Sequence, residues 1–442
     1  MKFKNSKNPI KKLNDIKSQN NFIWEIEGIN ILSKINNKDS KKSELKKNIE
    51  TLFLCQKLPS NLRLNFWLNL SGVKETMNLK ENNNYYNNLV KAFNIMIKRK
   101  HPFYLYLEKK ISLDLERSFN YEKYKITEEN INQLKNILYA FSVRNVSINY
   151  CQGLNTIVVY LLETTNFKEE ESFYLFIKLL EDILPYDYYL MGIGIEAEMI
   201  IINKILKKFL PDLIKHLNKI EGDMILDTSL TSFISSLFIF KMDRNVTNFC
   251  MDCFYLLSRL GEKEDGDIFF YFYKIILAIF KCLKKDLMKC KDISQVNDVL
   301  KFEAISKENL EIIIFYTFIG NEIASNLDYI KKIRKEEVDK IIKNKKMIFK
   351  FNNDNNIECN INYPICVEEK DNINSIDLYR IYKRGKKSKF IKQKKEENNL
   401  DDNNNKCIIK IDDDNLEEND EEILENIVIE RRKHYCKNKN NF

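Results

Sequence analysis

Glycine, proline and histidine are scarce in this sequence, with 10 Gly, 6 Pro and 3 His among 442 residues. Sandwiches and barrels made only of β-strands need many tight turns, which are rich in glycine and proline. The scarcity therefore argues against an all-β fold and excludes a collagen-like one. The patterns GxxxxGK[ST], GxSxG and HExxH are also absent. P-loop enzymes, hydrolases with a serine elbow and zinc proteases therefore have no support.

Long hydrophobic runs are lacking as well. The most apolar stretch, 268–283, is interrupted by Lys274 and Lys281 and is shorter than the roughly 20 residues that cross a bilayer. Residues 1–12 are basic, but no apolar core follows them, so we do not expect a secretory signal. We therefore expect a cytoplasmic protein whose 10 cysteines remain thiols. The net charge of +8 is a mild excess and does not by itself indicate nucleic acid as a partner.

Metal-ligand patterns are incomplete. Cys250 and Cys253 form one CxxC pair, but the second pair that a zinc site needs is missing at any suitable spacing. Cys253 falls on the apolar face of a helical pattern, so the sequence predicts that it packs in the core. We expect no metal site and no cofactor of the protein's own.

Composition divides the chain into three zones. Residues 1–48 are Lys-rich and polar around one apolar patch at 22–24, whereas residues 50–335 hold most of the aromatic residues and nearly all of the periodic apolar pattern. Residues 341–442 are polar and show little apolar periodicity. We expect one large domain over 50–335, with polar, largely disordered N- and C-terminal extensions.

The C-terminal extension contains a basic block at 380–395, and an acidic block follows at 412–430. Blocks of like charge are usually solvated tails. A peripheral contact with an anionic membrane surface and a nuclear-import signal are the alternatives for the basic block.

Apolar residues in the middle zone recur at helical spacing. Ile131, Leu134, Leu138 and Phe141 fall on one helical face, and Thr127 is suited to cap the start of that helix. The same pattern predicts helices over 60–70, 84–98, 169–182, 196–209, 229–240, 264–284 and 307–330. Strand alternation with hairpin turns is absent, so the predicted fold class is all-α, a large domain of many packed helices.

Three short polar patterns occur in one order within this helical zone. They are RxxxW after Leu58 and Pro59, IxxDxxR, and YxQG. Each pattern alone is weak, but the three together in this order are much more specific. They contain, in chain order, Arg63, Trp67, Asp114, Arg117, Tyr150, Gln152 and Gly153, and Asn155 follows.

In these residues the sequence resembles the TBC domain, the all-helical domain of Rab GTPase-activating proteins. The resemblance covers about 50–335 and includes the stretch around YxQG and the later region that ends at Asp252. This sequence departs from the family's frequent residues at four positions, with Lys57 and Asn149 for glycine, Val146 for proline and Met251 for tryptophan.

The resemblance implies that two residues act in trans on GTP bound to a partner. Arg117 would be an arginine finger, because a planar, permanently charged guanidinium neutralises charge that develops on the phosphates. Gln152 would orient the attacking water, because a carboxamide donates and accepts hydrogen bonds at once. GTP and Mg²⁺ would be carried by the partner, a GTP-bound Rab-family GTPase, and the protein would regulate vesicle trafficking.

The other motif residues have structural alternatives. Asp114 either orients Arg117 or forms an incidental pair with it, and Tyr150 packs to fix the segment of Gln152. Arg63 and Trp67, at i and i+4, either hold the domain together or contact the GTPase. Two further residues are expected to be structural: Gly153 permits close packing or a sharp entry into the next helix, and Asn155 forms hydrogen bonds.

Two functions from different classes fit these observations. The first is a GTPase activator that supplies both finger residues and has no independent catalytic activity. The second is a catalytically silent scaffold or effector of the same fold. Both Arg117 and Gln152 are present, which favours the activator.

Overall fold

The protein is described here by a computed structural model. The structure describes residues 9–20, 22–35, 41–79, 84–115, 118, 127–145, 148–185, 187–220, 230–231, 233–239, 242–260, 269–300 and 305–344.

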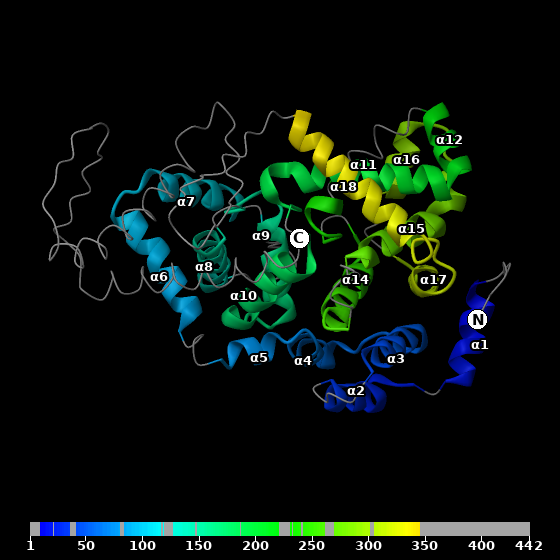
Figure 1. Ribbon diagram of the computed structural model, residues 1–442, viewed down its shortest axis with the longest axis horizontal. Helices are drawn as coiled ribbons and strands as arrows, with labels where there is room; N and C mark the ends of the chain where they lie inside the picture. Colours follow the sequence, from blue (N-terminus) through cyan, green and yellow to red (C-terminus); the bar gives the residue numbers. More distant parts are fainter. Residues whose placement is uncertain are drawn as a thin grey trace, which may run out of the picture. The chain divides into compact units, whose positions relative to one another are not determined.

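Every regular element in these described ranges is a helix, as the sequence predicts (Figure 1). The elements are α1 (Pro9–Gln19), η1 (Trp24–Gly28), α2 (Ile29–Lys34), α3 (Lys42–Cys55), α4 (Ser60–Leu70), α5 (Val73–Met77), α6 (Tyr85–Lys98), α7 (Pro102–Leu115), α8 (Glu128–Arg144), α9 (Leu154–Thr164), α10 (Glu169–Lys178), η3 (Leu179–Ile183), η4 (Leu190–Gly192), α11 (Ile193–Phe209), α12 (Pro211–Lys219), α14 (Arg244–Leu257), α15 (Phe270–Leu287), α16 (Ile293–Leu300), α17 (Lys307–Phe318) and α18 (Leu327–Asn344).

The helices belong to two compact units. The larger unit takes its described residues from 1–83, 118–134 and 151–342, and the smaller from 84–117 and 135–150. The smaller unit therefore contains α6, α7 and most of α8. Gln152 belongs to the larger unit and Asp114 to the smaller one.

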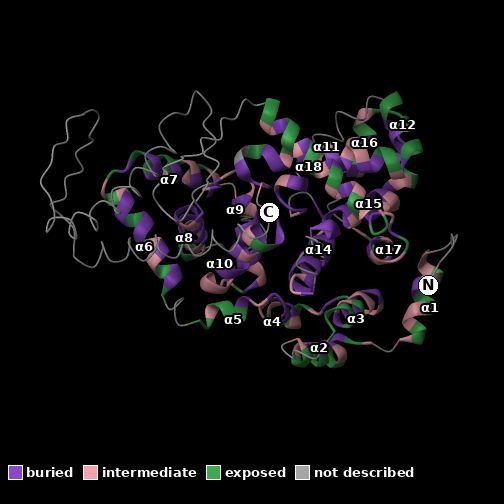
Figure 2. Ribbon diagram, viewed as in Figure 1, coloured by how far each residue is buried: buried purple, intermediate pink, exposed green. Residues whose placement is uncertain are grey.

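Helix α14 forms the centre of the larger unit. Its residues from Val246 to Leu257 are all buried except Asn248, because the segment is apolar on every side (Figure 2). It packs against α4 and α15, and α15 packs in turn against α17. Helix α12, in contrast, keeps an exposed polar face (Figure 2). Cys250 and Cys253 lie inside α14 with no exposed surface, which confirms the predicted core packing of Cys253.

Part of the N-terminal extension, within residues 9–35, packs on this core. Leu13 of α1 is buried where α1 packs on α3 and α17. The ring of Trp24 lies 5.1 Å from that of Phe53 and 5.6 Å from that of Phe66. The composition of this segment does not indicate that it packs on the core, because its few large apolar side chains lie among many lysines.

The predicted helix over 307–330 is wrong, because two helices with a break between them occupy this stretch. Helix α17 ends at Phe318, and Gly320 then adopts a positive φ of 63°. The side chain of Asn321 accepts a hydrogen bond from the backbone of Ile323 at 3.0 Å, which stabilises the turn. Helix α18 runs on to Asn344, past the predicted domain end at 335.

The predicted N-cap of the helix after Thr127 is confirmed. The hydroxyl of Thr127 accepts a hydrogen bond from the backbone N–H of Asn130 at 3.2 Å, as an N-cap does. Asn149, at a position where the family often has glycine, adopts φ 48°. Asparagine tolerates this left-handed conformation better than most residues do, which explains why it can replace glycine here.

Candidate functional site

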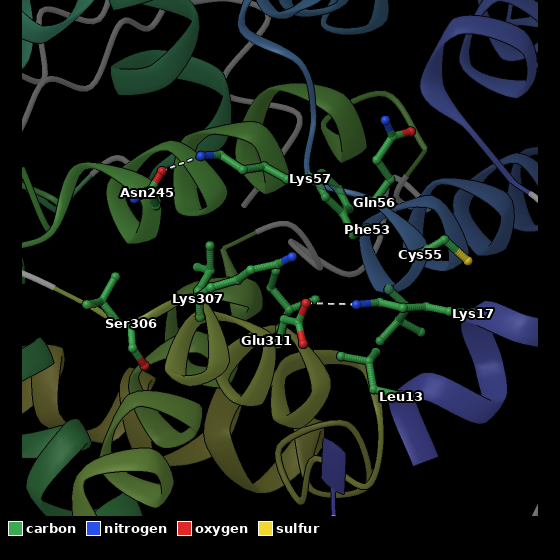
Figure 3. A pocket seen from close by; sticks show the side chains of 14 residues that line it. Leu13, Lys17, Phe53, Cys55, Gln56, Lys57, Asn245, Ser306, Lys307 and Glu311 are labelled. Carbon is green, nitrogen blue, oxygen red and sulfur yellow. Dashed lines mark hydrogen bonds and ion pairs between the residues drawn. The ribbon is translucent and has the colours of Figure 1, made fainter. Parts of the chain in front are cut away.

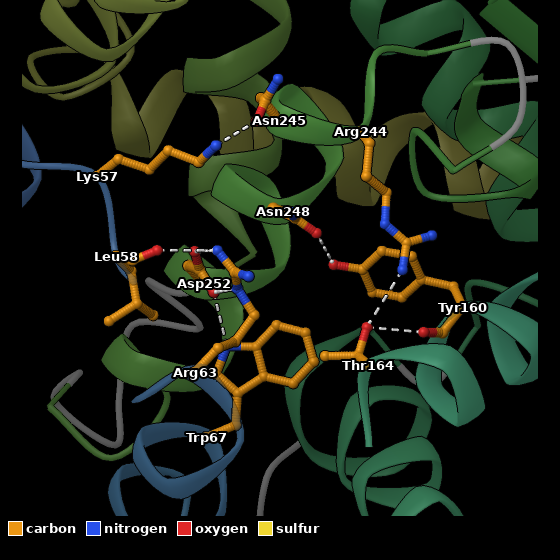
Figure 4. Close-up of polar contacts among 10 residues, drawn as sticks. All are labelled: Lys57, Leu58, Arg63, Trp67, Tyr160, Thr164, Arg244, Asn245, Asn248 and Asp252. Atoms are coloured by element: carbon orange, nitrogen blue, oxygen red, sulfur yellow. Dashed lines mark hydrogen bonds and ion pairs between the residues drawn. The ribbon is translucent and has the colours of Figure 1, made fainter. Parts of the chain in front are cut away.

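The first motif forms a buried polar cluster with Asp252 of α14 (Figure 4). Arg63 donates through Nε to Oδ1 of Asp252 at 2.9 Å and through Nη2 to Oδ2 at 3.3 Å. Trp67 Nε1 donates to the same Oδ1 at 2.8 Å, and Arg63 Nη2 also donates to the carbonyl of Leu58 at 3.1 Å. Arg63 and Trp67 therefore join α4 to α14 inside the larger unit.

Burial and mutual attraction oppose each other in this pair. It raises the pKa of Asp252, while the charge of Arg63 and the hydrogen bonds act in the opposite direction. Burial lowers the pKa of Arg63, but the attraction of Asp252 outweighs it and the net shift is upward. Each group needs the other, since an unpaired charge in this interior is strongly unfavourable.

A second polar group lies beside this pair on α9 and α14 (Figure 4). The guanidinium of Arg244 lies 4.2 Å from the ring centroid of Tyr160 and pairs with Glu163 at 2.8 Å. The Tyr160 hydroxyl donates to Asn248 at 2.8 Å, and the Tyr160 ring lies 6.3 Å from that of Trp67. These contacts fix α9, the helix that begins directly after Gly153.

Gln152 lies in the turn before α9 and is exposed. Its carboxamide has no hydrogen-bond partner among the described residues. The backbone around it is held: the N–H of Gly153 donates to Asn155 Oδ1 at 3.1 Å, and Asn155 Nδ2 donates to Ser118 Oγ at 2.8 Å. The structure thus places a free carboxamide on a fixed turn.

Gly153 is required in this turn. Its φ of 104° is unfavourable for other residues, and a Cβ atom at this position would lie 2.7 Å from the carbonyl oxygen of Ser235. The hydroxyl of Tyr189 donates to that same carbonyl at 2.8 Å. Burial raises the pKa of Tyr189 well above its ordinary value, so the hydroxyl stays protonated and acts as a donor.

The third motif begins in the smaller unit, where Tyr150 contacts α7. Its hydroxyl donates to Oδ2 of Asp114 at 2.6 Å, and Lys110 Nζ donates to the Tyr150 carbonyl at 3.1 Å. Tyr150 is almost completely buried. The structure therefore pairs Asp114 with Tyr150, a contact that the spacing of IxxDxxR does not predict. Arg117 lies outside the described residues, as do the blocks at 380–395 and 412–430.

Asp252, Ser118 and Ser235 lie against predicted motif residues, and Tyr189 bonds Ser235, but none of the four was predicted as a partner. A signal for Asp252 was available, because it is a single carboxylate within the apolar stretch CMDCFYLL. A buried carboxylate in such a helix must be paired. The other three residues have no comparable signal in the sequence.

A separate cavity of about 470 Å³ lies in the larger unit between α1, α3 and α17 (Figure 3). Apolar residues such as Phe53 and Leu310 form much of its lining. Lys17 pairs with Glu311 at 2.8 Å across it, and Lys57 donates to Asn245. None of the predicted motif residues lines this cavity.

The described part of the chain contains no group of three or more His, Cys, Asp or Glu side chains suited to a metal ion. None of the described helices is long and apolar enough to span a membrane. The six described cysteines are all free thiols.

Comparison with known proteins identifies similar sequences. The family model for the Rab-GTPase-TBC domain matches residues 60–288. The chain is 28% identical over 207 residues to TBC1 domain family member 2A of Homo sapiens, covering 46% of this chain and 20% of that protein. It is 26% identical over 171 residues to the TBC domain-containing protein C4G8.04 of Schizosaccharomyces pombe, covering 38% and 20%. The matched part is about a fifth of the length of these relatives.

Solved structures show the same fold. The Chlamydomonas flagellar RabGAP TBC domain matches with a TM-score of 0.51 at 20% identity, covering 71% of this chain and 95% of that one. The Ypt/Rab-GAP domain of Gyp1p matches with a TM-score of 0.50 at 17% identity, covering 67% and 99%.

Proposed function

Because the chain belongs to the Rab-GTPase-TBC domain family, we propose that it is a GTPase-activating protein for a Rab-family GTPase. The observation that carries the proposal is Gln152, an exposed carboxamide on a backbone held by Gly153 and Asn155. A group that acts on a partner's substrate must be accessible and also held in place. Gln152 meets both conditions.

The proposed reaction is GTP hydrolysis on the partner, which brings its own GTP and Mg²⁺. The carboxamide of Gln152 accepts a hydrogen bond from the attacking water and donates one to a phosphate oxygen or a backbone group, which orients the water for in-line attack. The guanidinium of Arg117 neutralises the charge that develops as the γ-phosphoryl group transfers. Both residues act on GTP that the partner holds, so the protein has no reaction of its own without the GTPase.

Asp114 and Tyr150 support this arrangement in the smaller unit. Their hydrogen bond of 2.6 Å ties the last turn of α7 to the residue that precedes Cys151 and Gln152 in the chain. Arg117 follows α7 by two residues. We propose that the bond fixes the backbone on which both finger residues depend, and that Asp114 acts as its acceptor.

A silent scaffold is the second candidate. Such a protein would bind the GTP-bound partner without needing a free carboxamide or an arginine at these positions. The presence of both residues favours the activator. We further propose that the basic block 380–395 contributes a peripheral contact with endomembranes, where a trafficking GTPase would be found.

The test uses the full chain and a panel of GTP-loaded Rab proteins, with phosphate release as the measurement. We expect at least one Rab to be accelerated. Arg117→Ala and Arg117→Lys should both lower the stimulated rate by on the order of 10³-fold or more, because lysine lacks the planar fork. Near-normal turnover with Arg117→Lys would contradict the finger assignment.

The role of Gln152 has its own test. A Rab whose catalytic glutamine is replaced should still respond to the wild-type protein, since the water needs only one carboxamide. It should not respond to Gln152→Ala. Tight binding of GTP-loaded Rab without any acceleration across the panel would support the scaffold instead.

A further inference from the structure

We propose that Ser118 and Tyr189 are positioning residues that hold the turn of Gln152 from two sides. Ser118 acts through Asn155, and Tyr189 acts through the carbonyl of Ser235. This inference rests on the proposed function, because it assigns Gln152 the task of orienting water. Neither residue belongs to the three sequence motifs.

The first side is a bridge made by a single carboxamide. Asn155, on the first turn of α9, is only 8% exposed. Its oxygen accepts from the N–H of Gly153 at 3.1 Å and its nitrogen donates to Ser118 Oγ at 2.8 Å. Because the carboxamide is planar, these two bonds set the distance between Gly153 and Ser118.

Ser118 follows Arg117 directly in the chain, so the bridge reaches the residue next to the proposed arginine finger. The bridge therefore links Ser118, which follows Arg117, to Gly153, which follows Gln152. Movement of the Gln152 turn is passed to the chain at Ser118, and movement of Ser118 is passed back.

The second side is the carbonyl of Ser235, against which Gly153 packs. The Tyr189 hydroxyl donates to that carbonyl at 2.8 Å, from a side chain that is 3% exposed. Tyr188, the residue before Tyr189, makes the same kind of bond to the preceding carbonyl: its hydroxyl donates to Ile234 O at 2.8 Å. Only the Tyr189 bond reaches the oxygen that the Gln152 turn contacts.

Positioning matters here because Gln152 itself is held by nothing else in the described chain. A displacement of about 1 Å in a group that orients a reactant can cost on the order of 100-fold in rate. Loss of either support should therefore lower turnover more than binding. The effect should appear in kcat of the stimulated hydrolysis and leave KM for the GTPase unchanged.

The experiment compares Tyr189→Phe with Tyr188→Phe in the full chain. Both variants remove one buried hydroxyl that bonds a neighbouring carbonyl, so their Tm values should fall by similar amounts. We expect Tyr189→Phe to lower kcat at least about tenfold with KM unchanged, and Tyr188→Phe to retain kcat. Equal kcat in the two variants would overturn the role of Tyr189.

Ser118→Ala and Asn155→Ala test the bridge. Ser118→Ala removes only the outer bond and Asn155→Ala removes both bonds, so both variants should lower kcat, and combining them should add nothing beyond the effect of Asn155→Ala. Additive losses, or wild-type kcat in both variants, would overturn the bridge. Ser118 is only half-buried, so Ser118→Ala keeps the test valid if a tyrosine variant does not fold.

Gln152→Ala separates this inference from the proposed function. If Gln152→Ala retains full stimulated turnover, the proposed function fails first and the positioning role fails with it. If Gln152→Ala is inactive while Ser118→Ala and Tyr189→Phe keep wild-type kcat, only the positioning role is wrong.

Discussion

Arg63 and Gln152 come from motifs of the same family resemblance, but the structure uses them in opposite ways. Arg63 is 5% exposed and bonds Asp252 and a backbone carbonyl, whereas Gln152 is exposed and its carboxamide has no partner among the residues that the structure describes. Around Arg63 the polar groups satisfy one another, and around Gln152 only the backbone is satisfied. A motif residue can thus be buried inside the domain or remain accessible to a partner, and burial distinguishes the two.

Breaking the buried pair should have the largest effect on stability. Asp252→Ala leaves the Arg63 guanidinium buried without its partner, so we expect about 3–5 kcal/mol lower free energy of unfolding. Denaturant unfolding of the full chain measures this. Glu163→Ala is the matched control, because its partner Arg244 is 38% exposed and the pair should be worth about 1 kcal/mol or less. Equal losses of unfolding free energy in the two variants would contradict the proposed difference between the buried and the partly exposed ion pair.

Gln152→Ala should lower turnover and leave stability nearly unchanged, the reverse of Asp252→Ala. We expect stimulated turnover to fall by at least about 100-fold, as for other positioned polar groups. The Tm should change little, because the removed side chain is exposed and makes no hydrogen bond to the described residues. Stopped-flow phosphate release and thermal unfolding of the same preparation measure the two quantities. A large fall in Tm would mean that Gln152 is structural, as Arg63 is.

Gly153→Ala should affect both quantities, because this glycine lies where the exposed turn meets the core. We expect about 1–3 kcal/mol of destabilisation from the positive φ and the contact with Ser235, together with reduced turnover from the displaced turn. Gly320→Ala is the control, since its φ is also positive but nothing lies within 4 Å of the added Cβ. Only Gly153→Ala should lower turnover, and an equal loss in both variants would argue against displacement of the Gln152 turn.

Removal of residues 345–442 should have the smallest effect. The described core ends with α18, where Ile341 is buried and Asn344 is the last helical residue. The removed residues lack the apolar content that a core requires. We expect Tm and turnover on a soluble GTPase to remain at their full-length values. A drop in either would show that the tail supports the domain.

Much of the fold follows from periodicity in the sequence. The spacing of apolar residues predicts α4 with its bounds, and Thr127 predicts the start of α8. The break at Gly320 was not predicted, because apolar residues continue on both sides of it and one glycine is a weak signal. The contribution of Trp24 was not predicted either, because burial depends on which distant residues surround a side chain.

The site was predictable in part. Three patterns in order indicate which residues matter, but patterns cannot reveal partners that are remote in the chain. Arg63 and Asp252 are 189 residues apart, and Asn155 and Ser118 are 37 apart. Such pairs are decided by tertiary packing, which local spacing does not encode.

The distance along the chain between paired residues also sets an order of events during synthesis. Lys17 of α1 pairs with Glu311 of α17, which is 294 residues later. The apolar faces of α1 and α3 are therefore made early, but the helix that covers them emerges only when nearly the whole domain has left the ribosome. Until then these faces are open to aggregation or to chaperones. Helix α1 is thus synthesised well before its partner α17 and is among the last elements to find its place.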